Sequence, residues 1–492
     1  MGGYVAAAEA AWMGVPQATE FLDQPAVVPD AARPPQRRLG FLNREFGIAA
    51  AAVVLMGSFL TSAMLGAIRQ ILFNHQFGAG TDASAYYAAF RLPDTLFSLI
   101  AGGALSSALI PVLLSTRREE GEEDAQRLTS LVLNVLLLAI LLITAVAELT
   151  APLFVRHVLV PGYASGTQDL AIRLTRIMLL QPIILVAGSV AIAVLNSRNQ
   201  FLLTALSVAS HNLALIAGIV ATATDPRLGI YGPTLGVIAG AVLQVLIVLP
   251  GVIGSGARYH PAWNLSDPRL REVLHLLVPN GVAVGVAYTG FIVDTAFASG
   301  ASDAASLAAI QNAWLLVGLP IALLGQAIGQ GAFPRLAAHA AAGEYRELRR
   351  TLVRALLIVG GLALGAIAGT LVLGRPVIRV LFEHGEFTAH DGALTAQVLV
   401  LYAIGLPAYV ATELLVRALI ALRDARTQLI TNSGQVALRI ALVALLLHAL
   451  QVKAIPVALV VAASSETAVL LTIALRRLAR LQTGPFVNAA PA

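Results

Sequence analysis

Cysteine is absent from the 492 residues, and lysine occurs only once, at Lys453. The absence of cysteine excludes disulfide bonds, thiolate metal sites and thiol-based catalysis. Charged residues are also scarce, because Lys, Arg, Asp and Glu together make up 12% of the chain. So few charges would cover too little of a water-facing surface, whereas a surface that faces lipid needs almost none. A soluble enzyme of several domains is therefore excluded.

Apolar residues dominate the chain, at 58% of all positions and a mean hydropathy of +0.80. They gather in stretches of roughly 20 residues or more, which is the length that crosses about 30 Å of hydrocarbon. Twelve such stretches lie near 47–73, 84–115, 127–150, 168–196, 201–222, 229–254, 271–297, 303–333, 346–373, 391–421, 427–449 and 453–476. The sequence therefore predicts an all-α polytopic membrane protein with about twelve transmembrane helices.

The two halves of the chain repeat each other. FGAGTDAS at 77–84 matches FASGASDA at 297–304, and PLFVRHVLVPGY at 152–163 matches PVIRVLFEHGEF at 376–387. A shared offset and a shared place in the helix order indicate an internal repeat. Because each copy holds six helices, an even number, the copies have the same orientation, with a pseudo-twofold axis along the membrane normal and a cavity between the lobes.

The repeat sets the expected domain boundaries. We expect an N-terminal lobe at 46–256 with helices 1–6, and a C-terminal lobe at 257–480 with helices 7–12. Residues 1–45 contain acidic residues and prolines and lack the order of a cleavable signal peptide. This segment is predicted to be a disordered cytoplasmic tail, and 481–492 a second, C-terminal cytoplasmic tail.

Basic residues predict the orientation of these helices. With the N-terminus placed in the cytoplasm, the inner segments hold 21 Lys and Arg, whereas the outer loops hold five. Basic residues near helix ends resist translocation, so this ratio predicts that both termini are cytoplasmic. Six further arginines lie inside predicted helices: Arg69, Arg91, Arg173, Arg176, Arg417 and Arg439.

Several motifs occur in the order found in one known family. They are FGAGTDASAYYAAFRLPDTLFSLIAGGALSSALIPVL at 77–113, LFEHGEFT at 381–388, YAIGLP at 402–407 and RDART at 423–427. In these motifs the chain resembles the MurJ/MviN family, the lipid II flippases of the multidrug/oligosaccharidyl-lipid/polysaccharide exporter superfamily. The similarity extends over roughly residues 45–450.

The resemblance implies a function in peptidoglycan biosynthesis. A flippase of this family turns undecaprenyl-pyrophosphate-linked peptidoglycan precursor from the inner to the outer leaflet of the bacterial inner membrane by alternating access. The implied partners are this lipid-linked precursor, membrane lipids and cell-wall synthesis enzymes, and no nucleic acid. The resemblance implies a transporter and no enzyme, with no catalytic residue, metal or cofactor.

Two intramembrane arginines are candidates for contact with an anionic head group. Arg69 ends the first predicted helix, and Arg91 lies about 10 Å along the second helix from its outer end. An unpaired arginine inside a membrane is costly, so each should face a wet cleft or an acidic partner. Snorkelling to the outer interface is the alternative. By analogy with the family, Gln311 and Asn312 on the eighth helix should also face the cleft.

A second set of charges is expected near the middle of the membrane. Arg439 and Glu466 lie at depths that differ by about 3 Å when counted from the cytoplasmic ends of their helices. Asp294 matches a family position that contributes to a cation site in some members. We expect Arg439 to be a built-in cation held by Asp294, Glu466 or both, with a role in ion coupling. A purely structural salt bridge is the alternative.

The remaining intramembrane charges favour simpler interpretations. Arg173 and Arg176 lie close enough to a helix end to snorkel. Glu413 and Arg417 are four residues apart on one helix, a spacing that favours a local ion pair.

The match to the family also fails at some positions. Family members usually have further arginines where this chain has Ala63, Phe97 or Ser98, and Leu315, and a glutamate where it has Gly102. They also usually have fourteen helices. Three functions therefore stay open: a flippase for lipid II, an exporter of another lipid-linked glycan or amphipathic small molecule, and a scaffold for cell-wall enzymes that transports nothing.

Overall fold

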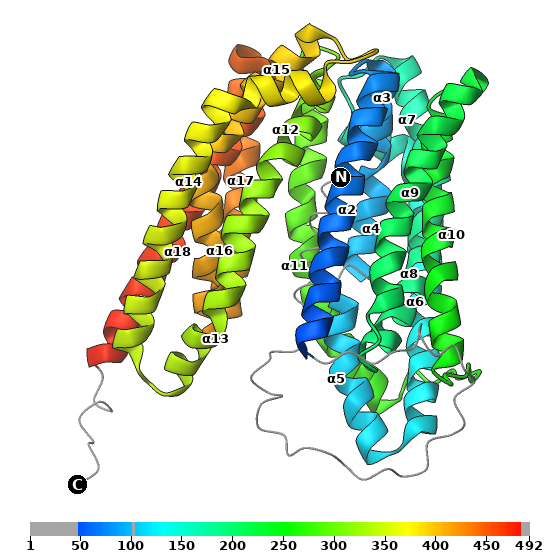
Figure 1. Ribbon diagram of the computed structural model, residues 1–492, viewed down its shortest axis with the longest axis vertical. Coiled ribbons are helices and arrows are strands. Elements are labelled where there is room, and N and C mark those ends of the chain that lie inside the picture. The colour runs from blue at the N-terminus through cyan, green and yellow to red at the C-terminus, as the bar shows by residue number, and fades with distance from the viewer. Residues whose placement is uncertain (1–47, 101–103, 423, 484–492) are drawn as a thin grey trace. The chain divides into compact units, whose positions relative to one another are not determined.

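A computed structural model describes residues 48–100, 104–422 and 424–483, and every regular element in these ranges is a helix (Figure 1). The predicted tail at 1–45 lies outside the described residues, and so do Gly102 and most of the predicted tail at 481–492. The last described helix ends at Thr483.

The chain forms two compact units, Met1–Tyr288 and Thr289–Ala492. The division falls inside the helix α11, Pro268–Ser299, because the first turns of this helix pack into the core of the first unit. Leu270, Val273 and Leu277 are buried there. The lobes expected at 46–256 and 257–480 follow the sequence repeat, whereas the two units follow the packing of the chain. The lobes therefore stay a prediction.

Unit 1 consists of long helices and a few short segments. Its elements are α2 (Ile48–Phe77), α3 (Thr81–Ala89), α4 (Arg91–Ile100), α5 (Ala104–Glu119), α6 (Glu122–Phe154), η1 (Val155–Leu159), α7 (Ser165–Met178), α8 (Leu180–Asn196), α9 (Leu202–Thr224), η2 (Pro226–Leu228), α10 (Tyr231–Gly254) and the beginning of α11. Leucine, valine and isoleucine side chains of α5, α6 and α8 form most of its core.

Unit 2 also consists of long helices and a few short segments. Its elements after α11 are α12 (Ser306–Pro320), η3 (Ile321–Gln326), α13 (Ala327–Ala341), α14 (Tyr345–Phe382), α15 (Ala389–Ile404), α16 (Leu406–Ala421), α17 (Ala425–Leu450), η4 (Gln451–Lys453) and α18 (Ala454–Thr483). The segment η3 is a π-helix that continues α12 into α13.

The described helices agree with the predicted number of crossings. Ten helical stretches are long and apolar enough to span a membrane, and α15 with α16, bent by 45° at Gly405, form an eleventh. One of the ten, Arg426–Gln482, consists of two helices, α17 and α18, which pack against each other. Counted separately, they give twelve crossings. The predicted class, an all-α polytopic membrane protein, is confirmed, whereas the pseudo-twofold axis stays a prediction.

Contacts at the helix ends show that the crossings alternate within each unit. In unit 1, Arg198 after α8 forms an ion pair with Glu122 at the start of α6 and donates to the carbonyl oxygen of Ser255 after α10 at 2.8 Å. In unit 2, Gln482 at the end of α18 donates to the carbonyl oxygen of Tyr345 at the start of α14 at 3.0 Å. Segments that the charge pattern assigns to one side of the membrane therefore meet at one end of their own unit.

Within the RDART motif, the described residues 424–427 form the beginning of α17. The Asp424 carboxylate caps α17, accepting hydrogen bonds from the backbone nitrogen and the hydroxyl of Thr427 at 3.1 and 2.8 Å, and it pairs with Arg477 of α18. Partial burial raises the pKa of Asp424, but these hydrogen bonds and the positive charge outweigh burial and hold the pKa below its ordinary value. The motif therefore fastens α18 to the start of α17.

Glycines allow α9 and α10 to cross closely. Gly232, Gly236 and Gly240 are spaced by four residues on α10 and so share one face of the helix. A Cβ atom on Gly236 would lie 3.0 Å from the carbonyl oxygen of Ala214, and one on Gly240 would lie 2.9 Å from the Nδ1 atom of His211. Small residues at such crossings are typical of membrane helices, whose backbones pack directly.

Substituting Gly236→Leu should therefore destabilise unit 1. The leucine would meet the backbone of α9, and overpacking costs about 1–3 kcal/mol or more. We expect a lower midpoint of thermal unfolding in detergent. Gly361→Leu on α14 is the matched control, because nothing lies within 4 Å of a Cβ atom at that position. Equal midpoints for the two variants would contradict the close crossing.

Candidate functional site

The two predicted head-group arginines lie in unit 1, on different helices. Arg69 is on α2 and is 7% exposed, and Arg91 begins α4 and is 6% exposed. Most of each side chain is therefore enclosed by protein, which argues against the snorkelling alternative. Their contact with a substrate stays a prediction.

A buried carboxylate accompanies these arginines. Asp94 lies three residues after Arg91 on α4 and is 9% exposed. It lies within electrostatic range of both Arg91 and Arg69. The cluster thus contains two guanidinium groups and one carboxyl group. Asp94 was not among the predicted site residues, although its spacing of three residues from Arg91 places both on one helix face.

Polar and aromatic side chains of α2 and α3 lie beside this charge cluster. Gln70 donates to the hydroxyl of Tyr87 at 2.6 Å and to the Oδ1 atom of Asn74 at 2.9 Å. Tyr86 and Tyr87 are both within electrostatic range of Arg69. Polar residues inside a membrane are expensive and usually functional. Guanidinium, amide and phenol groups together offer the donors that a phosphorylated head group needs.

The second set of predicted charges lies in unit 2 and contains an ion pair. Arg439 of α17 donates through Nη2 to the Oδ2 atom of Asp294 of α11, and the two side chains are 8% and 5% exposed. Asp294 is therefore the partner of Arg439. Glu466 of α18, 9% exposed, lies instead beside Thr431, whose side chain forms a hydrogen bond with it. Within the described residues, no ion pair joins Glu466 to Arg439.

Small and aromatic residues surround the Asp294–Arg439 pair. A Cβ atom on Gly290 would lie 2.8 Å from Nη1 of Arg439, so glycine leaves room for the guanidinium. Tyr409 of α16 is within electrostatic range of both charges. Its ring packs against Trp314 of α12 with the centroids 6.3 Å apart. The pair is thus held in a tightly packed part of unit 2.

The two predicted polar residues of α12 are also buried. Gln311 is 3% exposed and Asn312 is 0% exposed. Their contact with a substrate stays a prediction, because neither side chain is accessible in this structure.

The other intramembrane charges have local partners. Glu413 and Arg417 form an ion pair of 2.6 Å on α16, which confirms the predicted pairing. Arg173 donates to the hydroxyl of Tyr231 at 3.1 Å, and Arg176 pairs with Glu148 at 3.2 Å. Both of these arginines are exposed, in agreement with their interpretation as snorkelling residues.

Comparison with known proteins identifies relatives over most of the chain. The model of the lipid II flippase MurJ family matches residues 73–488. A probable lipid II flippase MurJ of Rhizobium tropici is 30% identical over 415 residues, which cover 83% of this chain and 78% of that protein. The lipid II flippase MurJ of Burkholderia cenocepacia is 30% identical over 387 residues, 77% of this chain and 74% of that protein.

Solved structures of two kinds of transporter share the fold. One is a lipid II flippase MurJ in an inward closed conformation, with a TM-score of 0.73 and 22% identity over 90% of this chain and 94% of that chain. The other is an inward-facing multidrug resistance transporter of the MATE family in the MOP superfamily, with a TM-score of 0.74 and 14% identity over 88% of this chain and 99% of that chain.

These matches confirm the family that the sequence motifs indicated. The structural likenesses concern the fold alone, whereas the family model covers Arg91, Asp94, Asp294, Arg439 and Glu466, and begins four residues after Arg69. With its apolar spanning helices, the chain is a multi-pass membrane protein. It belongs to the lipid II flippase MurJ family.

Proposed function

We propose that this protein moves lipid II from the inner to the outer leaflet of the bacterial inner membrane by alternating access. The observation that carries the proposal is the burial of two guanidinium groups, those of Arg69 and Arg91, within the spanning helices of unit 1. A pyrophosphate head group cannot cross hydrocarbon unaided, because desolvating its charge is too costly. Buried guanidinium groups replace part of its hydration and make the crossing feasible.

The membrane potential supplies a driving force in this proposal. With the inside negative, outward movement of an anion gains about 2.3 kcal/mol per charge for every 100 mV. The proposed orientation has both termini in the cytoplasm. It is supported by the excess of Lys and Arg in segments that meet at one end of each unit.

The Asp294–Arg439 pair is proposed to act in ion coupling. A guanidinium held by Asp294 is a permanent cation at a place where a mobile ion would otherwise balance the carboxylate. Transport by this chain should then need no sodium. A structural salt bridge is the alternative role, and it differs from coupling because it predicts no change in ion dependence when Arg439 is replaced.

A second candidate substrate is another lipid-linked glycan. It is favoured by the absence of arginine at Ala63, at Phe97 or Ser98, and at Leu315, where the family usually has more positive charge for the head group. A cargo with fewer negative charges would need fewer arginines. Cell-wall synthesis enzymes are the proposed protein partners under either substrate.

Complementation tests the proposed function. Expression of this protein in a bacterium depleted of its own lipid II flippase should restore growth and cell shape. The Arg156→Gln variant is a suitable positive control, because Arg156 is an exposed arginine paired with Asp169 outside the proposed site. If the protein is inserted in the membrane at normal levels and growth is not restored, lipid II is not the substrate.

A further inference from the structure

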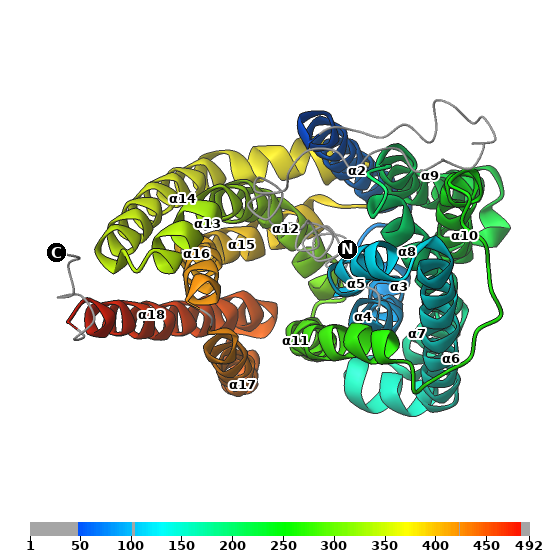
Figure 2. The same cartoon turned by 90° about the horizontal axis from the view of Figure 1, so that it is seen from below.

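The connection between α10 and α11, residues 255–267, follows an unusual route. It has no helix of its own apart from short turns, and it runs along the outer side of α6 (Figure 2). Three side chains spaced by four residues on α6 fasten it. Gln126 donates to the carbonyl oxygen of Gly256 at 3.1 Å, Ser130 accepts from the backbone nitrogen of His260 at 3.0 Å, and Asn134 donates to the carbonyl oxygen of Ala262 at 3.0 Å.

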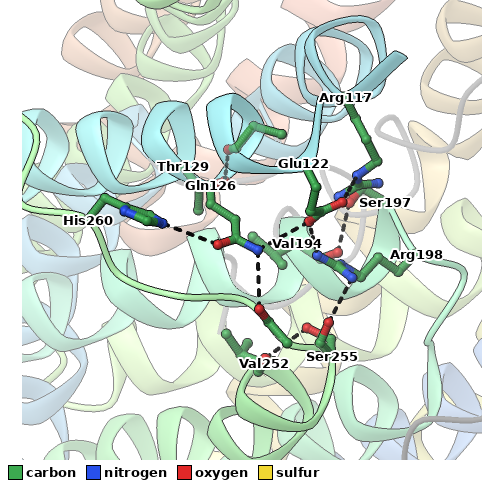
Figure 3. Close-up of polar contacts among 12 residues, drawn as sticks. Arg117, Glu122, Gln126, Thr129, Val194, Ser197, Arg198, Val252, Ser255 and His260 are labelled. Carbon is green, nitrogen blue, oxygen red and sulfur yellow. Dashed lines mark hydrogen bonds and ion pairs between the residues drawn. The ribbon is translucent and has the colours of Figure 1, made fainter. Parts of the chain in front are cut away.

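The beginning of this connection is also tied to the neighbouring turns, as Figure 3 shows. Arg198 contacts both the Ser255 carbonyl oxygen and Glu122, and Glu122 also pairs with Arg117 at 2.8 Å. The His260 ring lies 3.3 Å from Oε1 of Gln126. The backbone of the connection is therefore held in place along its length.

The attachment points place the connection at the edge of the hydrocarbon. Asn134 lies twelve residues after Glu122, which is about 18 Å along α6. A helix of 33 residues is about 50 Å long and extends about 10 Å beyond each side of a 30 Å hydrocarbon core when centred. Asn134 and the backbone around Ala262 thus lie about 8 Å inside the edge of the hydrocarbon. At that depth the carbonyl oxygen of Ala262 needs the partner that Asn134 supplies.

The side chains of the connection divide into two sets. Ala257 and Ala262 pack against the core of unit 1. Tyr259, Trp263 and Leu265 are 62%, 58% and 58% exposed, although the backbone that carries them is fixed. Tyrosine and tryptophan favour the head-group level of a membrane, because one part of each ring system is apolar and another is polar. Exposure of these side chains to water would be costly, whereas exposure to lipid would be favourable.

Two arginines flank the exposed side chains. Arg258 and Arg271 are both exposed, and no ion pair holds either of them within the described part of the chain. Arg269 differs, because Glu119 and Glu120 bind its guanidinium. Arginine at this level of a membrane suits the phosphate of an anionic phospholipid.

We propose that residues 257–265 form a lipid-binding segment that inserts Trp263 and Leu265 into the adjacent leaflet and, with Arg258 and Arg271, binds the head group of an anionic phospholipid. The segment is separate from the arginines of α2 and α4, and its role does not depend on the transported substrate. Under the proposed orientation, the lipid belongs to the cytoplasmic leaflet.

Tryptophan fluorescence tests the insertion. The chain has three tryptophans, so the Trp12→Phe/Trp314→Phe variant retains Trp263 alone. In vesicles that contain brominated phosphatidylcholine, Trp263 should lose most of its emission, whereas acrylamide in the water should quench it weakly. As a matched control, adding Arg118→Trp and Trp263→Phe places the sole tryptophan at the exposed end of α5. Acrylamide should then quench this tryptophan strongly, and bromolipid should quench it weakly. Strong quenching of Trp263 by acrylamide and weak quenching by bromolipid would overturn the proposal.

The same variant tests the lipid class. In vesicles that mix phosphatidylglycerol and phosphatidylcholine, Trp263 should be quenched more when the bromine is on the phosphatidylglycerol. Adding Arg258→Gln and Arg271→Gln should abolish this preference without ending the quenching by lipid. Adding Arg118→Gln instead should leave the preference for phosphatidylglycerol unchanged. An equal preference with and without Arg258 and Arg271 would overturn the assignment of the head-group site.

Discussion

Replacing Arg69 or Arg91 by glutamine should abolish transport and weaken the binding of lipid II by about 10- to 100-fold, because a hydrogen bond to a charged group contributes about 1.5–3 kcal/mol. Either substitution removes one of the two guanidinium groups and leaves a single arginine beside Asp94 to bind the head group. Binding is measured with fluorescent lipid II and purified protein in detergent. Complementation reports on transport.

A substitution at Asp94 should have the opposite effect on the binding of lipid II. Substituting Asp94→Asn keeps a similar shape and removes the carboxyl group that competes with the head group for the two arginines, so we expect tighter binding of lipid II. Arg156→Gln serves as the control for loss of an arginine elsewhere in unit 1. If Arg69→Gln and Arg91→Gln bind lipid II as the unaltered protein does, these arginines do not contact the head group.

Breaking the Asp294–Arg439 pair should have the largest effect on stability. Substituting Asp294→Asn leaves a buried guanidinium without its counter-charge, which costs about 3–5 kcal/mol. We expect a marked fall in the midpoint of thermal unfolding in detergent. The double variant Asp294→Asn/Arg439→Gln should recover much of the loss, because it removes both charges. A double variant no more stable than Asp294→Asn would show that the pair does not account for the effect.

Transport by Arg439→Asn separates the two roles of this pair. The variant keeps Asp294 and removes its built-in cation, so a mobile cation can take its place. We expect transport in sodium-containing medium and reduced transport in sodium-free medium, whereas the unaltered protein should work equally in both. If neither activity nor sodium dependence changes, the coupling role is wrong.

The sequence predicted the fold well, because helix number depends on the length of apolar runs. The local pair of Glu413 and Arg417 was also predictable, since a spacing of four residues on one helix determines it. Partners on different helices were harder. Counting depths placed Glu466 near Arg439, but Glu466 lies beside Thr431, which is eight residues or about 12 Å before Arg439 on α17. Such counting assumes helices upright and in register, and it contains no information on their crossing.

The head-group cluster was predicted only in part. Sequence spacing alone pairs Arg91 with Asp94, but their proximity to Arg69 depends on how the helices of unit 1 are arranged in space. Similarly, the exposed residues Tyr259 and Trp263 were not among the residues predicted from the sequence. Their depth depends on Asn134, which holds the loop far along α6, and sequence spacing contains no information on this contact between distant residues.

The most direct test of the central claim is transport by the purified protein in vesicles. Lipid II with a labelled head group is placed in the inner leaflet, and its arrival in the outer leaflet is followed with a reagent that cannot cross the membrane. We predict that the protein accelerates arrival, that a potential favouring anion movement in that direction increases the rate, and that Arg69→Gln/Arg91→Gln returns it to the rate of protein-free vesicles. Equal rates for protein-containing and protein-free vesicles, or for the unaltered protein and this variant, would contradict the account.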